Sequence, residues 1–157
     1  MTRLPLEYRL ATQLDAIAVT DLCEEFHGAS YQKTVPFDWD IMVEWVSDRI
    51  DDDGSLVLGA WSGSDLVGCV IGLTFVPPYS ERVVAGDYIW YVRPEYRGGM
   101  VGVRLMKMFE DWAVDAGAAQ ILTGATSGIS TDVASALIKR LGFSSVGGTM
   151  YKDVNNG

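Results

Sequence analysis

The apolar positions of this chain follow two different periods, and their order predicts a mixed α and β architecture. Segments rich in β-branched and aromatic residues, or alternating with polar ones, predict strands at residues 4–10, 55–61, 66–75, 83–92, 119–123 and 143–154. Apolar residues spaced three and four apart predict four helices, two after the first strand and one on each side of the strand at 119–123. The predicted order is β-α-α-β-β-β-α-β-α-β around one central sheet.

Polar residues and glycines mark the ends of the predicted helices. Thr12 and Asp38 are suited to cap the first two helices, and Gly117 and Gly142 to end the last two. Each of the first three predicted helices has one apolar face. In the first helix this face carries Leu14, Ile17, Ala18, Leu22 and Phe26, and in the second it carries Trp39, Met42, Val43, Val46 and Ile50. In the third helix it carries Val101, Leu105, Met108, Phe109, Trp112 and Ala116.

The connections restrict how the strands pair. Residues 62–65 are rich in turn formers and predict a hairpin between the strands at 55–61 and 66–75. The strand–helix–strand unit at 83–123 implies a parallel pairing with a right-handed crossover. No repeat or long linker divides the chain, so residues 1–157 are expected to form a single domain.

Composition excludes several classes of protein. Nearly half of the residues (48%) are apolar, which is enough for a buried core, but the longest nearly apolar run, residues 66–76, is far shorter than the ~20 residues of a membrane span. The net charge of −9 argues against nucleic-acid binding. One histidine and two cysteines without paired spacing predict no metal site, and the absence of a secretion signal favours the cytoplasm.

The charge is unevenly distributed along the sequence. Residues 1–65 hold 13 acidic and four basic residues, whereas residues 93–107 hold four basic residues and one acidic residue. A local basic segment on an acidic protein indicates a small anionic ligand. The alternative is that these are ordinary solvated surface charges.

The segment from Val92 to Gly102 is the most specific stretch, because a strand end, a glycine-rich turn and a helix start follow one another directly. The free N–H groups at a helix N-terminus favour a phosphate or pyrophosphate. Gly98 and Gly99 let the backbone approach such a ligand, and Arg97 adds a cation. The turn lacks the Gly-Lys-Ser/Thr end of a Walker loop and the glycine spacing of a dinucleotide-binding loop. A plain strand–helix connection is the alternative interpretation.

These residues resemble the GNAT N-acetyltransferase superfamily, whose fold has a mixed sheet of six to seven strands and about four helices. The match is strongest at residues 92–117, and it continues in the last helix at Ala134, Leu137, Gly142 and Phe143. The resemblance implies that acetyl-CoA is bound and that a homodimer can form at the edge of the C-terminal strand. It assigns the pyrophosphate to the turn formed by Arg97, Gly98, Gly99, Met100, Val101 and Gly102, the pantetheine arm to the backbone of Tyr91, Val92 and Arg93, and a cofactor contact to Thr131.

Three positions depart from the family pattern. Met100 stands where the family has the central glycine of the turn, and Thr131 replaces an asparagine. Ile138 replaces a tyrosine that often protonates the departing thiolate, and an aliphatic side chain has no proton to give. The acid role then falls to water or to another side chain. Alternatively, the protein is a non-catalytic CoA-binding or protein-interaction module.

Asp87 and Tyr88 are the candidate catalytic residues, near the middle of the strand at 83–92. A carboxylate is suited to act as a base and a phenol to relay a proton, while a backbone N–H near Tyr91 or Val92 is suited to polarise the thioester carbonyl. Strand alternation predicts that only one of Asp87 and Tyr88 faces a cleft. The alternative for Tyr88 is an aromatic side chain packed in the sheet, and the alternative for Asp87 is a solvated residue at a strand end. A third alternative is a route through water without a dedicated base.

The acidic first part of the chain predicts a cationic acceptor. The resemblance places residues 1–65 beside the acceptor, so Glu24, Glu25, Asp38 and Asp40 are expected to attract a polyamine, an aminoglycoside-like amine, a lysine or a protein N-terminus. Charge that serves only solubility is the alternative.

Overall fold

Five strands pair in the order in which they occur along the chain. In the computed structural model, which describes residues 3–125 and 127–154, the sheet order is β1-β2-β3-β4-β5. The strands are β1 (Leu6–Leu10), β2 (Ser55–Ser62), β3 (Asp65–Phe75), β4 (Val84–Val92) and β5 (Gln120–Leu122). Pairing is antiparallel from β1 to β4 and parallel between β4 and β5, which confirms the predicted hairpin and the predicted parallel pair.

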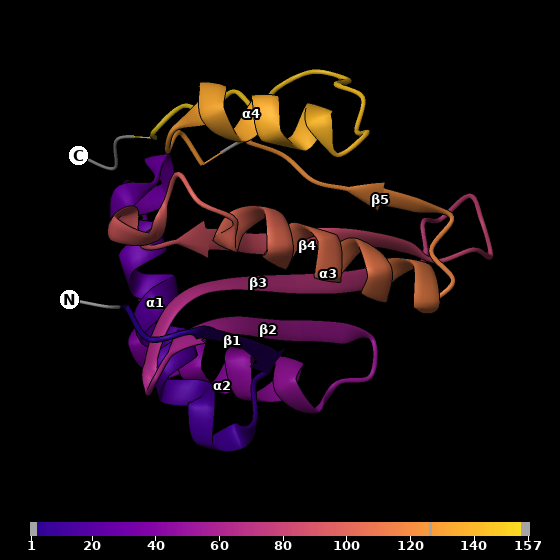
Figure 1. Ribbon diagram of the computed structural model, residues 1–157. Coiled ribbons are helices and arrows are strands. Elements are labelled where there is room, and N and C mark those ends of the chain that lie inside the picture. The colour runs from indigo at the N-terminus through magenta and orange to yellow at the C-terminus, as the bar shows by residue number, and fades with distance from the viewer. Residues whose placement is uncertain (1–2, 126, 155–157) are drawn as a thin grey trace.

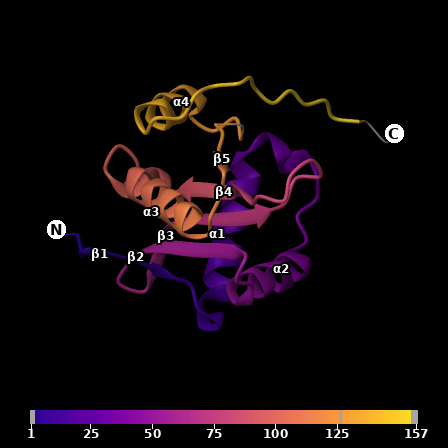
Figure 2. The same ribbon diagram turned by 90° about the vertical axis from the view of Figure 1, so that its right-hand side faces the viewer.

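Helices cover both faces of this sheet (Figures 1 and 2). α1 (Ala16–Ala29) and α2 (Trp39–Asp51) lie on one face and α3 (Val101–Asp115) on the other, while α4 (Thr131–Arg140) lies on the β5 side. The core is accordingly divided into two clusters, one with Val19, Leu22, Cys23, Val46 and Ile71, and one with Leu58, Val70, Leu105, Met106 and Phe109. None of the helices in the described part of the chain combines the length and apolar character that crossing a membrane requires.

α3 packs directly on the backbone of β3. Gly72 makes this possible, because a Cβ there would lie 2.6 Å from the ring of Phe109, far inside van der Waals contact. Phe109 is fully buried, and Trp112 stacks against it at a centroid distance of 6.0 Å. This packing holds the second half of α3 on β3. The start of α3 is linked to β4 by Trp90, whose Nε1–H donates to Gly102 O at 3.1 Å.

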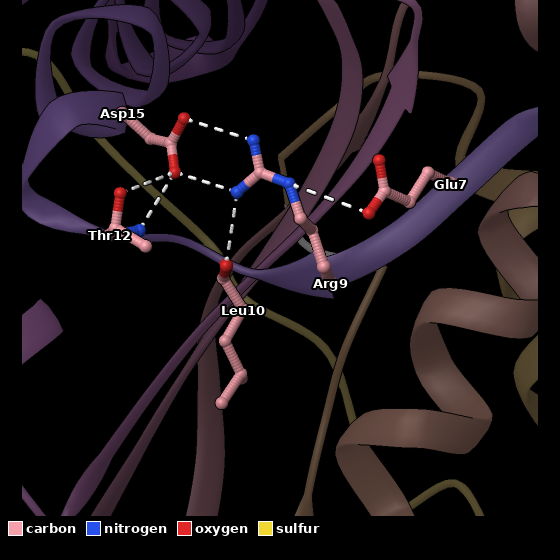
Figure 3. Close-up of polar contacts among 5 residues, drawn as sticks. All are labelled: Glu7, Arg9, Leu10, Thr12 and Asp15. Carbon is pink, nitrogen blue, oxygen red and sulfur yellow. Dashed lines mark hydrogen bonds and ion pairs between the residues drawn. The ribbon is translucent and has the colours of Figure 1, made fainter.

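The junction between β1 and α1 is held by one carboxylate (Figure 3). Asp15 accepts two hydrogen bonds from the Arg9 guanidinium, at 2.7 and 3.2 Å, and also accepts the N–H and the hydroxyl of Thr12. Thr12 is the N-cap residue of the short 3₁₀ turn Gln13–Asp15 that leads into α1. Asp38 caps α2 as predicted, since its Oδ1 accepts the Ile41 N–H at 3.1 Å.

The buried face of α1 agrees with the predicted one at Ala18, Leu22 and Phe26 and differs from it at the N-terminal end. Leu14 is 95% exposed and Ile17 is 60% exposed, whereas Val19 and Cys23 are buried. The reason is that Leu14 lies in the 3₁₀ turn before α1, so the residues that follow do not continue its helical phase.

The prediction of a strand at residues 143–154 is wrong, because none of these residues belongs to a strand. Among the described residues the sheet has five strands instead of the expected six to seven. This segment instead contacts the 3₁₀ turn Tyr31–Thr34. Tyr151 packs on Tyr31 at 4.6 Å between ring centroids, and the Thr34 hydroxyl donates to Asp153 at 2.6 Å. The described residues therefore lack the C-terminal strand edge on which a homodimer was expected.

Candidate active site

A cavity of about 1380 Å³ lies where β4 and β5 diverge. Only Val84–Gly86 of β4 pairs with β5, at Gln120–Leu122. Beyond Gly86, this side of β4 has no strand partner within the described residues. The opposite wall comes from Leu122 at the end of β5, from α4 and from the segment between them, of which residues 123–125, 127, 129 and 130 line the cavity.

Most of the predicted site residues meet in this cavity. Nine line it: Asp87, Tyr88, Tyr91, Val92, Arg97, Gly98, Gly99, Met100 and Gly102. Arg93, Val101 and Thr131 do not line it, although Ser130 and Asp132, the two neighbours of Thr131, do. The expected phosphate turn and the expected catalytic pair thus share one cavity.

The turn before α3 presents bare backbone to the cavity. Gly98 has a φ of +82°, a conformation that favours glycine, and a Cβ at Gly98 or Gly99 would meet nothing within 4 Å. The first helical bond runs from the Arg104 N–H to Met100 O at 2.9 Å. The N–H groups from Val101 to Val103 therefore have no carbonyl partner within the helix, which is the arrangement that binds anions.

Met100 occupies the family's glycine position without backbone strain. Its φ of −95° and ψ of −2° are ordinary for any residue at the start of a helix. Its side chain is 66% exposed on the cavity wall. The departure from glycine therefore changes the shape of the cavity and leaves the backbone donors in place.

Two arginines near the end of β4 have different partners. Arg97 donates its Nε–H to Val92 O at 2.7 Å and lies over the ring of Tyr91, so its guanidinium is held beside the turn. Arg93 points to α1, where it binds both carboxylate oxygens of Glu25 at 2.9 and 3.1 Å. Of these two arginines, Arg97 is the one that lines the cavity and can offer a cation to it.

Backbone direction narrows the expected pantetheine contacts. The Arg93 N–H already donates to Val67 O at 2.9 Å, on the β3 side. Because successive residues of an antiparallel strand point their backbone groups to alternate sides, those of Tyr91 also face β3. The backbone groups of Trp90 and Val92 face the open side of β4 instead.

A β-bulge explains how Asp87 and Tyr88 both reach the cavity. Ile89 pairs with Ile71 and Asp87 pairs with Gly72, so Tyr88 has no register partner on β3. The expectation that only one of the two faces the cleft is therefore wrong. Tyr88 is held against Trp45 of α2 at 5.1 Å between ring centroids. Gly72 and Gly86, which lie inside the two strands beside the bulge, are the sequence signal that could have indicated it.

Asp87 is the titratable group most altered by this environment. Burial raises the pKa of its carboxyl from 3.8 to about 6, and the neighbouring Thr123 hydroxyl offsets part of the rise. Thr123 Oγ1 is itself buried and has no partner at hydrogen-bonding geometry among the described residues. A carboxylate of this pKa is ionised at neutral pH and is a stronger base than an ordinary aspartate.

Some site residues escaped the sequence analysis. Thr123 follows β5 in a segment without a motif, and Phe26 and Phe75 read as ordinary core positions, yet all three line the cavity. Ile138 is buried, with 8% exposure, and does not line the cavity. Ala134 and Leu137 of the same helix do line it. Only the three-dimensional divergence of β4 and β5 identifies these positions.

The acidic residues of the first 65 positions do not line the cavity, whose charged lining residues are Asp87, Asp132, Arg97 and Arg140. Of the four carboxylates expected to attract the acceptor, Glu25 binds Arg93 and Asp38 caps α2. Glu24 and Asp40 are exposed on α1 and α2. Any attraction by this half of the molecule thus acts over a distance.

Comparison with known proteins gives one family. The model of the "Acetyltransferase (GNAT) family" matches residues 17–143, which is more than half of the chain. A search of curated protein sequences gave no match.

Solved structures show the same fold at low sequence identity. A ribosomal-protein-alanine N-acetyltransferase from Brucella melitensis has a TM-score of 0.70 and 16% identity, covering 96% of this chain and 100% of that one. The aminoglycoside N-acetyltransferase AAC(6′)-Iy, in complex with the bisubstrate analogue CoA-S-monomethyl-acetylneamine, has a TM-score of 0.74 and 12% identity, covering 96% and 99%. A transcriptional regulator from Bacillus halodurans has a TM-score of 0.74 and 17% identity, covering 96% and 100%.

Proposed function

The chain belongs to the GNAT acetyltransferase family, and we propose that it transfers the acetyl group of acetyl-CoA directly to a primary amine in a ternary complex. The acceptor amine is protonated in water and is therefore cationic. The observation that supports this proposal is the single cavity that joins the bare N-terminus of α3 to the half-buried carboxyl of Asp87.

The α3 end of the cavity suits the pyrophosphate of acetyl-CoA. The N–H groups from Gly99 to Val103 offer a set of backbone donors, and Arg97 adds a guanidinium held at the end of β4. The open edge of β4 at Trp90 and Val92 is suited to hydrogen-bond the amide groups of the pantetheine arm, as an added strand would. When bound, acetyl-CoA supplies an activated thioester carbonyl.

The residues of β4 provide the remaining chemistry. Asp87 accepts a proton from the acceptor ammonium, directly or through one water, which frees the nitrogen lone pair to form the C–N bond. A backbone N–H on the open edge of β4, at Trp90 or Val92, donates to the carbonyl oxygen as charge develops there. The C–S bond then breaks. The amide nitrogen gives its second proton to water, and the thiolate takes a proton from water or from the Tyr88 hydroxyl, which water then reprotonates.

One observation favours a second candidate, a CoA-binding module without catalysis. Ile138 gives no proton, and it lies in the core outside the cavity lining. Both candidates require CoA binding, so release of free thiol from acetyl-CoA in the presence of amines distinguishes them. Thiol release supports the transferase, and binding without thiol release supports the module.

The cofactor site is tested by a charge reversal with a matched control. Arg97→Glu should raise the Kd for acetyl-CoA at least about tenfold, because a charge-assisted hydrogen bond contributes about 1.5–3 kcal/mol. Lys107→Glu makes the same change of charge at an exposed position of α3 outside the cavity lining, and its Kd should stay within about twofold of the parent value. Equal Kd values for the two variants, measured by titration calorimetry, would place the anion site elsewhere.

A further inference from the structure

The end of the cavity farthest from the phosphate turn is walled by apolar side chains. Phe75 of β3, Tyr88 of β4 and Leu122 of β5 line it, and they are 49%, 61% and 44% exposed. Asp87 lines the same cavity, next to Tyr88 on β4. Large apolar side chains left open to solvent in a cavity that also holds a half-buried carboxyl indicate a ligand that covers them.

These walls are held in place before any ligand arrives. The ring of Tyr88 packs on Trp45 at 5.1 Å between ring centroids. A ring that is fixed by its neighbour loses little conformational freedom when a ligand binds. The Tyr88 side of the apolar surface is therefore a preformed part of the cavity.

The charges of the cavity do not suit a polycation. Its lining carries two carboxylates, Asp87 and Asp132, and two arginines, Arg97 and Arg140, so the formal charges cancel. The exposed acidic residues of α1 and α2 are not part of the lining. A second ammonium group placed against Phe75 and Leu122 would put a charge where a methylene group would bury apolar surface, which is the less favourable of the two contacts.

Resting on the proposed function, we propose that the acceptor is a primary monoamine carried on an apolar or aromatic body, and not a polyamine or an aminoglycoside. Asp87 receives the ammonium group, and Phe75, Tyr88 and Leu122 cover the apolar body. Each methylene buried on these walls contributes about 0.8 kcal/mol, which is about fourfold in kcat/KM.

A matched pair of amines separates these substrate classes. Pentylamine and 1,5-diaminopentane share a chain and a reacting group and differ by one ammonium, and 2-phenylethylamine and neamine extend the comparison to an aromatic body and an aminoglycoside. With acetyl-CoA and thiol release as the readout, kcat/KM per amino group should be at least about tenfold higher for pentylamine than for the diamine, because a hydrophobic contact is replaced by a buried charge. It should also rise about fourfold per methylene from propylamine to pentylamine.

Variants of the wall link this preference to the structure. Phe75→Ser should lower kcat/KM for pentylamine about tenfold or more, and Phe75→Asp should reverse the preference in favour of the diamine. Tyr79→Ser removes an aromatic residue that is 84% exposed and does not line the cavity. This control should leave kcat/KM for pentylamine and for 1,5-diaminopentane within about twofold of the parent values.

The outcomes distinguish the two proposals. If kcat/KM per amino group is higher for 1,5-diaminopentane or neamine than for pentylamine, the monoamine inference is overturned while the transferase function stands. No thiol release with any amine overturns the function. In that case calorimetry of pentylamine and 1,5-diaminopentane with the CoA-loaded protein still decides the inference, which requires the monoamine to bind more tightly.

Discussion

At the scale of single residues, Asp87 shows how burial alters a side chain's chemistry. Its carboxyl lies among apolar groups on a bulged strand, and burial raises its pKa to about 6. The ionised form is therefore unstable relative to an exposed aspartate, and the same instability makes it a better proton acceptor at neutral pH. The cost in stability and the proposed catalytic role have one physical origin.

This origin predicts opposite effects of Asp87→Asn on stability and activity. The folded pKa of about 6 exceeds the reference value of 3.8, so the folded state holds its proton more tightly and loses stability as pH rises between these values. At pH 7 the variant should be more stable than the parent by up to about 3 kcal/mol, and at pH 3.5 the difference should largely disappear. Urea unfolding at both pH values measures this.

The activity of the same variant is the second part of this prediction. Loss of a general base should lower kcat at least about 100-fold, and kcat/KM of the parent should fall as pH decreases through about 6. A variant that is stabilised at pH 7 and retains parental kcat would mean that the carboxyl is buried as described but takes no part in proton transfer.

At the scale of elements, the junction of β1 and α1 depends on Asp15, whose pKa is lowered where that of Asp87 is raised. Hydrogen bonds from Arg9 and Thr12 lower the pKa of Asp15 to about 2. The folded pKa is below the unfolded one, so this stability is present above pH 4 and is lost as pH falls through about 2. The short 3₁₀ turn and the start of α1 depend on these bonds (Figure 3).

Asp15→Asn should therefore destabilise the protein in a pH-dependent way. At pH 7 the loss should be about 1–2 kcal/mol, reduced by the partial exposure of Arg9, and it should shrink towards zero near pH 2. Glu7→Gln is the control, because Glu7 is exposed and lies 3.9 Å from Arg9, and it should change stability by less than about 0.5 kcal/mol. Equal losses in the two variants would contradict the assigned role of Asp15.

Which elements could be predicted depended on whether local signals fixed them. The Asp38 cap, the Ser62–Asp65 turn and the apolar stripe of α3 act within a few residues, and these elements were predicted well. The exposure of Leu14 was not predicted, because a 3₁₀ turn separates this residue from α1. The segment at 143–154 has strand-like residues, but Tyr151 and Asp153 bind the turn at Tyr31–Thr34 instead of a strand.

The candidate site divides in the same way. The glycine turn and Arg97 are continuous in sequence and could be identified from it, as could Asp87 and Tyr88 as neighbours on one strand. Thr123 and Phe75 could not, because they join the cavity through the divergence of β4 and β5. The bulge at Tyr88 depends on the register of β3, which no short motif encodes.

At the scale of the whole molecule, the fold creates the cavity by ending one strand pairing early. β5 is only three residues long and pairs with β4 no further than Gly86, while Trp90 donates its Nε1–H to Gly102 O at 3.1 Å and so holds the bare N-terminus of α3 beside the open edge (Figure 1). The charges of the cavity lining cancel, so the net charge of −9 comes from residues outside the lining. The proposed function therefore depends on one arrangement, an open β4 edge that leads to free helix amides.

A crystal structure with acetyl-CoA bound tests this arrangement most directly. We expect pyrophosphate oxygens about 3 Å from backbone nitrogens between Gly99 and Val103, and pantetheine amides paired with Trp90 or Val92 on the open edge of β4. Acetyl-CoA bound elsewhere, or with the side chain of Met100 occupying the space in front of these amides, would contradict it.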